Sequence, residues 1–320
     1  MSTVSNDLVS QTPMSGSASC SEVKFLPQPQ ISGVTPSLFV QPCSGTWISL
    51  LDCLCDSFPA ITRECWLSRF ERGRIWDEQL RPLPLNAPYR AGQRIFYFRE
   101  IRDEKIIPFS ETILYMDEHI LVADKPHFLP VIPGGEYVTQ TLLARLIAQL
   151  DNPELQPLHR LDRHTAGLVL FSVQKKTRSV YQALFRDRKI DKSYEAIAPI
   201  LPHLQFPHQR QSRIVRGEPF FLSQETIGEP NAHTIIEVME QKGQLCRYRL
   251  NPVTGKKHQL RLHMAGLGAP ICNDPFYPQV NDELAEDYTR PLQLLAKELK
   301  FSDPLSGERH HFISRLPLNW

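Results

Sequence analysis

The chain has no closely spaced cysteine pair of the kind that holds a metal ion or forms a redox disulfide. Its seven cysteines are an odd number, and none of them belongs to a CxxC motif. Such usage is typical of reduced thiols in a cytoplasmic protein rather than of a disulfide framework. Cys53 and Cys55 flank one leucine, and we expect both to belong to the core of a helix.

Signals for membranes and secretion are also lacking. The first twenty residues contain neither a basic stretch nor an apolar run, and no later apolar run approaches the length of a membrane span. We therefore expect a soluble cytoplasmic protein without a membrane partner. The sequence also lacks a glycine-rich loop for phosphates and a cluster of metal ligands. We expect neither a nucleotide cofactor nor any other cofactor or metal.

The chain has little net charge, because 36 Lys and Arg residues face 35 Asp and Glu residues. The cations are unevenly distributed, however. Residues 156–192 contain nine Lys or Arg against three Asp, and residues 247–261 contain five and no acid. Phosphate contacts are local and screened over about 10 Å, so these two segments could bind an anionic polymer. A charge-rich solvated surface would give the same pattern, and we expect the acidic run 282–287 to be a solvated helix or loop.

A length of 320 residues and a mass of 36.8 kDa exceed one typical domain. The first part, residues 1–36, is rich in Ser, Thr, Pro and Gln, which predicts a disordered tail. We expect a small module over residues 37–108, which ends in a charged linker around residues 100–112. A large domain follows over residues 109–320.

The most informative stretch is Leu158–Leu170, with the sequence LHRLDRHTAGLVL. Its single carboxylate, Asp162, lies between Arg160 and Arg163, with a histidine just outside each arginine. Opposite charges this close favour the ionised carboxylate, which suits a nucleophile better than a proton donor. A purely structural network of arginines and aspartate at a turn gives the same pattern. The small residues 165–167 favour a tight turn before a buried strand at 168–171.

Hydrophobic periodicity outlines the remaining elements. We expect two helices between residues 45 and 70, the second capped by Thr62, and a helix over residues 139–150. An irregular insertion is expected at 201–221, and residues 292–317 are expected to close a sheet. Strands are expected at 73–76, 94–98, 113–115, 120–123, 195–200, 232–239, 245–250 and from His258 to His263, and residues 189–196 look like the entry to the strand at 195–200.

Two further stretches, Lys189–Ala196 (KIDKSYEA) and Thr254–His263 (TGKKHQLRLH), complete a pattern with the first. Together the three resemble the motifs HRLDRxTSGLLL, KxYxA and TGRxHQIRxH of the RluA-type pseudouridine synthases. Residues 113–126, 268–274 and 292–317 resemble further parts of that family, so that the similarity spans roughly residues 111–318.

The resemblance implies a fold and a reaction. The fold is of the α+β class, with a mixed, mostly antiparallel sheet, flanking helices and a central catalytic cleft in residues 109–320. The reaction is the isomerisation of uridine to pseudouridine in structured RNA, which requires no cofactor. Residues 45–98 resemble a degenerate small RNA-binding module of two helices and a strand. Acidic residues dilute its basic run, so RNA binding and a structural role both remain open for it.

The resemblance also implies roles for single residues. Asp162 corresponds to the essential aspartate, whose nucleophilic attack is on either the sugar or the uracil ring. Tyr194 corresponds to the tyrosine that packs against the flipped uracil, and Arg261 to the arginine that pairs with the carboxylate. Arg160 corresponds to the residue that takes the place of the flipped base, a task that suits a planar guanidinium.

Other matched positions are expected to bind the substrate. His258 and Gln259 are scaffold residues or phosphate contacts, and His159 and Arg163 are further candidates. Lys256 replaces the family's arginine, which keeps the charge and loses the bidentate fork. The sequence departs from the family's KPAG where it has Lys125-Pro126-His127-Phe128, and this bulky pair replaces an expected tight turn.

Two alternatives remain open. A metallohydrolase could use His159, Asp162, His258 and His263 as ligands, although the arginines around Asp162 oppose a cation. A catalytically silent RNA-binding protein could keep the same fold, although binding alone does not require Asp162. The RNA target, either large-subunit ribosomal RNA or tRNA, is not indicated. The choice between these RNAs is expected to depend on residues 45–108 and 201–221. We expect a monomer, since no feature of the sequence requires an oligomer.

Overall fold

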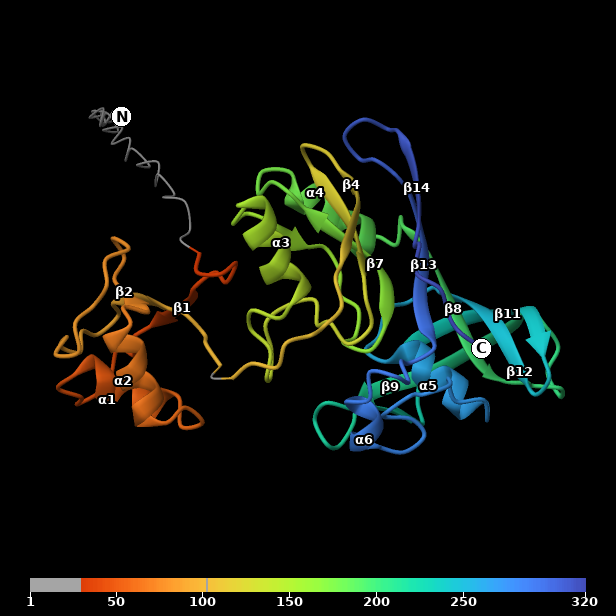
Figure 1. Cartoon of the computed structure of the whole chain (residues 1–320), viewed down its shortest axis with the longest axis horizontal. Coiled ribbons are helices and arrows are strands. Elements are labelled where there is room, and N and C mark those ends of the chain that lie inside the picture. The colour runs from red at the N-terminus through yellow and green to blue at the C-terminus, as the bar shows by residue number, and fades with distance from the viewer. Residues whose placement is uncertain (1–29, 102) are drawn as a thin grey trace, which may run out of the picture.

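The computed structural model describes residues 30–101 and 103–320 of the chain. Two sheets organise these residues, one of three strands in the order β1-β3-β2 and one of eleven strands. Figure 1 shows the corresponding two bodies, joined by the segment around residue 100. The helices are α1 (Leu50–Ser57), α2 (Arg63–Glu71), α3 (Leu142–Leu150), α4 (Arg178–Arg186), α5 (Gln259–Gly266) and α6 (Asp282–Ala285).

The small body consists of α1, α2 and the strands β1 (Ser37–Val40), β2 (Ile75–Trp76) and β3 (Arg94–Tyr97). Its helices pack on the sheet through a core that includes Leu54, Trp66 and Ile95. The Thr62 hydroxyl accepts a hydrogen bond from the Cys65 amide at 3.4 Å, which confirms the predicted cap. Two helices and the expected strands are thus present, while RNA binding by this body stays a prediction.

The segments before and after the small body are fastened to the large one. Most of the expected tail lies outside the described residues, but Val34 packs against Ala144 of α3 and against Val138, which precedes that helix. In the expected linker, the Glu104 carboxylate accepts hydrogen bonds from the backbone amides of residues 138–140 at 2.6 to 3.0 Å. Ile107 is buried in the core of the large body. Residues 104–107 are therefore held against the large body.

The large sheet has the order β10-β9-β11-β12-β8-β13-β7-β5-β4, with β14 paired to β13 and β6 to β7. All pairs are antiparallel except β13 with β7, so the sheet is mixed and mostly antiparallel. Its strands are β4 (Thr112–Met116), β5 (Ile120–Lys125), β6 (Gln156–Pro157), β7 (Ala166–Ser172), β8 (Asp191–Pro199), β9 (His208–Arg216), β10 (Ser223–Thr226), β11 (Ala232–Lys242), β12 (Leu245–Pro252), β13 (Leu294–Ser302) and β14 (Arg309–Ile313).

The strand that was expected to close the sheet, β13, lies in its middle, between β8 and β7. Its run of buried apolar residues fits this position, because both faces of a central strand are covered. Gly167 allows the backbones of β7 and β13 to approach, since a Cβ atom there would lie 2.3 Å from the Ala296 carbonyl oxygen. The short parallel contact brings the segment before β7 next to β8.

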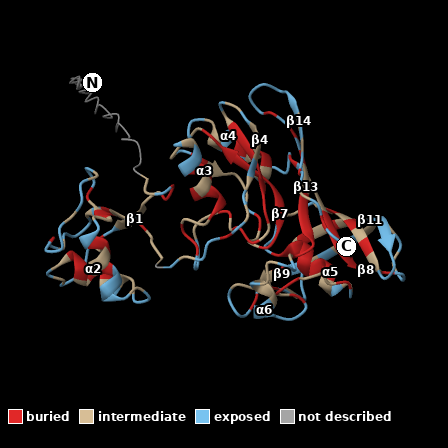
Figure 2. Cartoon of the chain, in the orientation of Figure 1, coloured by how far each residue is buried: buried red, intermediate tan, exposed pale blue. Residues whose placement is uncertain are grey.

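Helices cover both faces of the sheet around β7. Leu121 and Val169 face α3, while Ile120 and Leu168 face α4. Every residue of β7 is therefore buried, as the red strand in Figure 2 shows. The third helix, α5, packs on β8 and β12 through Leu260 and Met264. The segment between β7 and α3 is thereby held in a fixed place, and it contains Asp162.

The insertion at residues 201–221 was expected to be irregular, and this was wrong. It contains β9, which pairs with β11 on one side and β10 on the other. The residues of β9, HQRQSRIVR, are polar on both faces up to Ile214, so an apolar alternation could not indicate the strand. The insertion extends the sheet beside α5.

Phe128 occupies the position where the family has the glycine of KPAG, and its φ is 66°. This left-handed conformation costs a residue with a side chain about 1 kcal/mol or more. The ring is nevertheless buried, 4.9 Å from the ring of Tyr288 and 6.0 Å from that of Phe109 between centroids. Aromatic packing thus holds the loop that a glycine would otherwise permit.

The strained backbone and the buried ring of Phe128 have opposite effects on stability, and two substitutions at this position separate them. We expect F128A to lower the free energy of unfolding by about 3 to 5 kcal/mol, because the buried ring is lost while the strained φ remains. F128G loses the ring as well but relieves the strain, so it should be about 1 kcal/mol more stable than F128A. Urea denaturation followed by fluorescence measures both. Equal stabilities, or a less stable F128G, would contradict strain at this position.

Candidate active site

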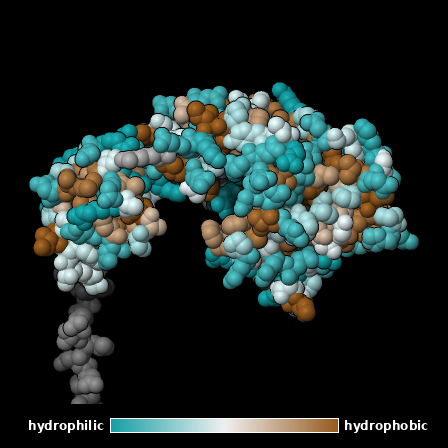
Figure 3. Space-filling view, turned by 60° about the horizontal axis from the view of Figure 1, so that its bottom comes forward, coloured by the Kyte–Doolittle hydropathy of each residue, from teal (hydrophilic) through white to brown (hydrophobic). Residues whose placement is uncertain are grey.

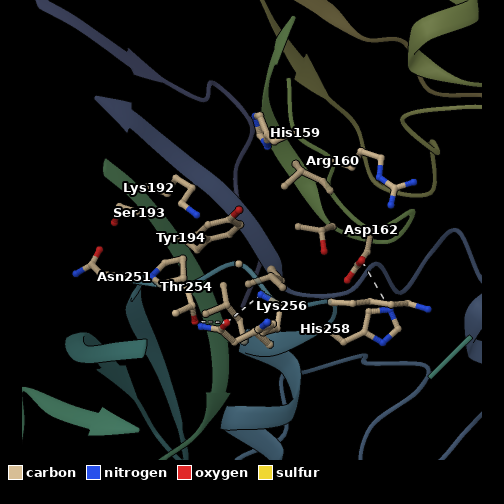
Figure 4. Close-up of a pocket in the computed structure, with 18 of the residues that line it drawn as sticks. His159, Arg160, Asp162, Lys192, Ser193, Tyr194, Asn251, Thr254, Lys256 and His258 are labelled. Carbon is tan, nitrogen blue, oxygen red and sulfur yellow. Dashed lines mark hydrogen bonds and ion pairs between the residues drawn. The ribbon is translucent and has the colours of Figure 1, made fainter. Parts of the chain in front are cut away.

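A pocket of about 1330 Å³ lies on the large body, where the three sequence motifs meet. Its walls come from the segment before β7, from the start of β8, and from the turn between β12 and α5 (Figure 4). Predicted site residues that line it are His159, Arg160, Asp162, Arg163, Tyr194, Lys256, His258, Gln259 and Arg261. The structure therefore brings all nine together from distant parts of the chain.

Asp162 lies at a turn that leads into β7, where its carbonyl oxygen accepts a hydrogen bond from the Thr165 amide at 3.2 Å. Its side chain is 29% exposed and opens to the pocket. One carboxylate oxygen lies 3.4 Å from Nη1 of Arg261, and the other lies 3.7 Å from Nε2 of His258. The carboxylate is accessible and oriented by two nitrogen groups.

Burial raises the pKa of Asp162, but His258 and Arg261 outweigh it, and the net pKa lies below the ordinary value of 3.8. Burial lowers the pKa of His258 to about 4, so the imidazole is neutral at pH 7. The charge that holds Asp162 ionised near neutrality is therefore chiefly the guanidinium of Arg261.

Arg261 is only 1% exposed and is held by a second carboxylate. Its Nε and Nη2 donate to the two oxygens of Asp274 at 2.8 and 2.6 Å, a bidentate pair. Asp274 is itself fixed by the amides of Phe276 and Tyr277, at 2.8 and 3.1 Å. Only the remaining nitrogen, Nη1, is directed at Asp162.

Residues 258–263 were expected to be a strand, and they form the beginning of α5 instead. His258 precedes the helix with a φ of 57°, and its Nδ1 lies 2.8 Å from the Tyr277 hydroxyl. The Arg261 guanidinium lies over the ring of Phe276, with its Cζ atom 4.8 Å from the ring centroid. The alternation was misleading because α5 is buried nearly all round, so it shows no apolar stripe at helical spacing.

Tyr194 faces the carboxylate from β8, and Figure 4 shows its ring in the pocket. The ring packs against the cores on both sides of the pocket. Burial, and next the charge of Asp162, raise the pKa of Tyr194. The phenol is therefore protonated at neutral pH and presents a flat face.

Gln259 uses its whole hydrogen-bonding capacity inside the protein. Its Nε2 donates to the His233 carbonyl and to the Thr234 hydroxyl. Its Oε1 accepts from the Thr254 hydroxyl at 2.7 Å and from the Lys256 amide at 3.1 Å. Of the two roles considered, these contacts favour scaffold, and they leave the Lys256 side chain exposed at the rim.

The cations before β7 differ in their contacts. Arg160 is exposed at the pocket. Arg163 pairs with Glu286 at 2.6 Å, so the acidic run at 282–287 has a structural partner in the motif. His159 stacks on Phe185, and its Nε2 accepts from the Leu170 amide at 3.1 Å.

Lys125 and Asp274 lie in stretches that matched the family, but the sequence suggested no role for either. The Lys125 amine is fully buried and donates to the carbonyls of Pro126, Leu129 and Arg163 at 2.8 to 3.2 Å. Burial lowers the pKa of Lys125 to about 7, against the opposing effect of Asp162. The sequence signal that could have indicated a buried Lys125 is its place at the end of a mostly apolar run (LVADKP).

The four candidate metal ligands do not converge. His263 is buried beside Ser212 and Thr234, away from the pocket, and His159 already accepts a backbone hydrogen bond. Among residues 30–101 and 103–320, no three His, Cys, Asp or Glu side chains are grouped so that they could hold a metal ion. In the same ranges, no helix has the length and apolar character of a membrane span.

Much of the face of the molecule shown in Figure 3 is hydrophilic, as its teal residues show. At the pocket itself, Arg160, Arg188, Lys192, Lys256 and Lys257 supply positive charge. Such a lining suits a polyanion.

Comparison with known proteins shows that this chain is similar to RNA pseudouridine synthases. A family model described as RNA pseudouridylate synthase matches residues 119–266. An uncharacterized RNA pseudouridine synthase of Synechocystis is 30% identical over 71% of this chain and 79% of that protein. The dual-specificity RNA pseudouridine synthase RluA of Haemophilus influenzae is 31% identical over 63% of this chain and 92% of that protein.

A solved structure supports the fold. Human RNA pseudouridylate synthase domain containing 1 has 22% sequence identity and a TM-score of 0.54. The superposition covers 66% of this chain and 87% of that one. The predicted fold class, a mixed and mostly antiparallel sheet with flanking helices, is confirmed for the large body.

Proposed function

Because this chain belongs to the RluA type of RNA pseudouridine synthases, isomerases that convert uridine to pseudouridine in RNA, we propose that Asp162 is its nucleophile. The single observation that supports this most strongly is the ionised carboxylate at the pocket, 3.4 Å from the buried Arg261. The reaction breaks the bond between C1′ of the ribose and N1 of uracil, turns the base, and rejoins C1′ to C5. A carboxylate with a depressed pKa is available for attack throughout the neutral pH range.

Each of the other site residues has its own role in this mechanism. Arg261 orients Asp162 and keeps it ionised. Tyr194 packs against the flipped uracil, and its raised pKa makes proton abstraction by the phenol unfavourable. Lys256 and Arg160 contact the RNA at the rim, while His258 and Gln259 hold the turn that presents Lys256. No cofactor takes part in these steps.

The target uridine leaves the base stack to reach Asp162, at a cost of a few kcal/mol. We propose that Arg160 occupies the vacated position, because it is exposed beside Asp162 and its guanidinium is planar. The substrate is structured RNA, either large-subunit ribosomal RNA or tRNA. Selection between them involves the small body and the insertion that contains β9.

A pseudouridine map of defined transcripts tests this function. Purified protein is incubated with unmodified tRNA and large-subunit ribosomal RNA transcripts, and pseudouridine is located by chemical sequencing. We expect one or a few sites with the intact protein and none with D162N. If transcripts bind tightly but no pseudouridine forms in any of them, the silent RNA-binding alternative is favoured.

Arg160 gives a prediction specific to base flipping. We expect R160A to slow pseudouridine formation about 10- to 100-fold on a target within a helix, because the vacated stack is no longer filled. On a short single-stranded target the loss should be less than about threefold, since less stacking must be broken. Single-turnover rates on the two RNAs measure this.

The matched control for R160A is R186A, which removes an exposed arginine paired with its neighbour Asp187. It should leave both rates unchanged. If R160A slowed both RNAs equally, Arg160 would act as a general phosphate contact and not as a substitute for the base.

A further inference from the structure

Lys192 is a pocket residue to which the proposed mechanism gives no role. It lies on β8 two residues before Tyr194 and, because side chains alternate along a strand, on the same face. Both side chains project into the pocket in Figure 4. Any base that packs on the Tyr194 ring therefore lies next to the Lys192 amine.

The Lys192 amine has no partner within the described part of the chain, in the sense that no acceptor or carboxylate lies at bonding distance. Burial, and next the charge of Arg188, lower the pKa of Lys192. Three other cations that line the pocket are paired with carboxylates, namely Lys300 with Glu298 at 2.6 Å, Arg163 with Glu286 at 2.6 Å and Arg249 with Glu237 at 3.9 Å. The pocket cations without a carboxylate partner are otherwise exposed, namely Arg160, Arg188, Lys256 and Lys257, whereas Lys192 is half-buried. A desolvated amine without a counter-charge is costly, and such groups concentrate at functional sites.

The surroundings of the amine define what it can reach. A Cβ atom built on Gly255 would lie 3.8 Å from Nζ of Lys192, so the amine faces the turn that precedes α5. In Figure 4 the Lys192 side chain also lies beside that of Tyr194. The edge of a planar ring that packs on the tyrosine would therefore come within reach of the amine.

We propose that Lys192 is a catalytic residue that stabilises the negative charge of uracil when the bond to the ribose breaks. This deepens the proposed function and rests on it. When the C1′–N1 bond breaks, its electron pair stays with N1 and spreads to the oxygens on C2 and C4. An Asp162 oxygen bonds to C1′ as the bond to N1 breaks. After the base has turned, C5 attacks C1′ and displaces the carboxylate, C5 gives its proton to water, and N1 takes up a proton from water.

A cation beside those oxygens lowers the barrier for the cleavage, because the charge develops only as the bond breaks. Asp162 and Lys192 would then act on opposite ends of the same bond. The Asp162 carboxylate bonds to C1′ of the sugar, and the Lys192 amine stabilises the negative charge of the leaving base. This division explains why Lys192 has no internal carboxylate partner, since a carboxylate would cancel its effect.

The experiment compares K192M with the exposed-lysine control K189M, three residues earlier in the chain. The substrate is a short unmodified transcript that carries the uridine located by the pseudouridine map. We expect K192M to lower the single-turnover rate constant at saturating RNA about 10²- to 10³-fold. The Kd for RNA should change less than about twofold, and K189M should change neither quantity. K192R, which keeps the charge, should recover part of the rate.

A better leaving group provides a readout that a structural role would not change. Fluorine at C5 withdraws electrons and stabilises the uracil anion, so the same transcript with 5-fluorouridine at the target needs less help from a cation. We expect the ratio of intact to K192M rates, followed as disappearance of the fluorouridine, to be at least about tenfold smaller than with uridine. An unchanged ratio would overturn charge stabilisation.

Two other results would overturn the proposal. If K192M raised the Kd and left the saturating rate unchanged, Lys192 would contact a backbone phosphate, and the slope of log Kd against log salt would fall by about 0.7. If neither quantity changed, Lys192 would not contact the substrate. Failure of the proposed function is distinct from both, since the intact protein would then form no pseudouridine. Thermal unfolding of K192M checks that it folds.

Discussion

We expect D162N to form pseudouridine at least about 10⁴-fold more slowly than the intact protein, because an amide oxygen cannot replace an ionised carboxylate as a nucleophile. The substitution keeps the size of the side chain and removes its negative charge. Arg261 keeps its bidentate partner Asp274, so the buried guanidinium stays paired. The fold should therefore survive, with a change in the free energy of unfolding of about 1 kcal/mol or less.

RNA binding gives the second half of this prediction. Removing a negative charge at a pocket that receives a polyanion should leave the Kd unchanged or lower it. The matched control is D191N, because Asp191 is an exposed aspartate that also lines the pocket. Single-turnover kinetics and filter binding measure both proteins. If D162N kept more than about one hundredth of the rate, another group would be the nucleophile.

The pH dependence of the intact enzyme follows from the same carboxylate. The pKa of Asp162 in the folded protein lies below its ordinary value of 3.8. The ionised form is therefore lost only as pH falls through that lower value, and not between pH 6 and 8. Ionisation of Asp162 likewise stabilises the fold above the ordinary value and loses this effect as pH falls below it.

Much of the large body could be predicted from local pattern. The hairpin of β4 and β5, the amphipathic helix α3 and the buried strand β7 all have apolar spacing that matches their surroundings. The motif that contains Asp162 combines charge with an adjacent buried strand, so its place in a turn before that strand could be predicted. These features depend on residues that are neighbours in the chain.

Features that depend on distant neighbours were missed. The central place of β13 results from pairing with β7 and β8, and no property of its sequence alone orders the strands. The helix α5 was expected as a strand because it is buried nearly all round, which removes the periodicity that distinguishes a helix. Asp274 was passed over because its partner, Arg261, is 13 residues away and the pairing arises from the fold.

That pairing leads to the second prediction of large effect. Asp274 touches neither the pocket nor Asp162, but it holds two of the three guanidinium nitrogens of Arg261. In D274N an amide N–H faces a buried N–H donor, and the cation loses its bidentate partner. We expect the free energy of unfolding to fall by about 3 to 5 kcal/mol, as when one member of a buried pair is removed. The saturating rate should fall about 100-fold, because Arg261 no longer orients Asp162.

A double variant separates stability from catalysis. R261M/D274L replaces both charges with apolar side chains of similar size, which is often neutral for stability even where each single change is costly. We expect it to unfold with a free energy closer to that of the intact protein than D274N does. Its rate should remain low, because burial would then raise the pKa of Asp162 with no guanidinium to oppose it. The residual rate should increase with pH as the carboxyl group ionises. Recovery of the rate along with stability would show that the pair only supports the fold, whereas a stable but slow enzyme shows that catalysis itself requires the pair.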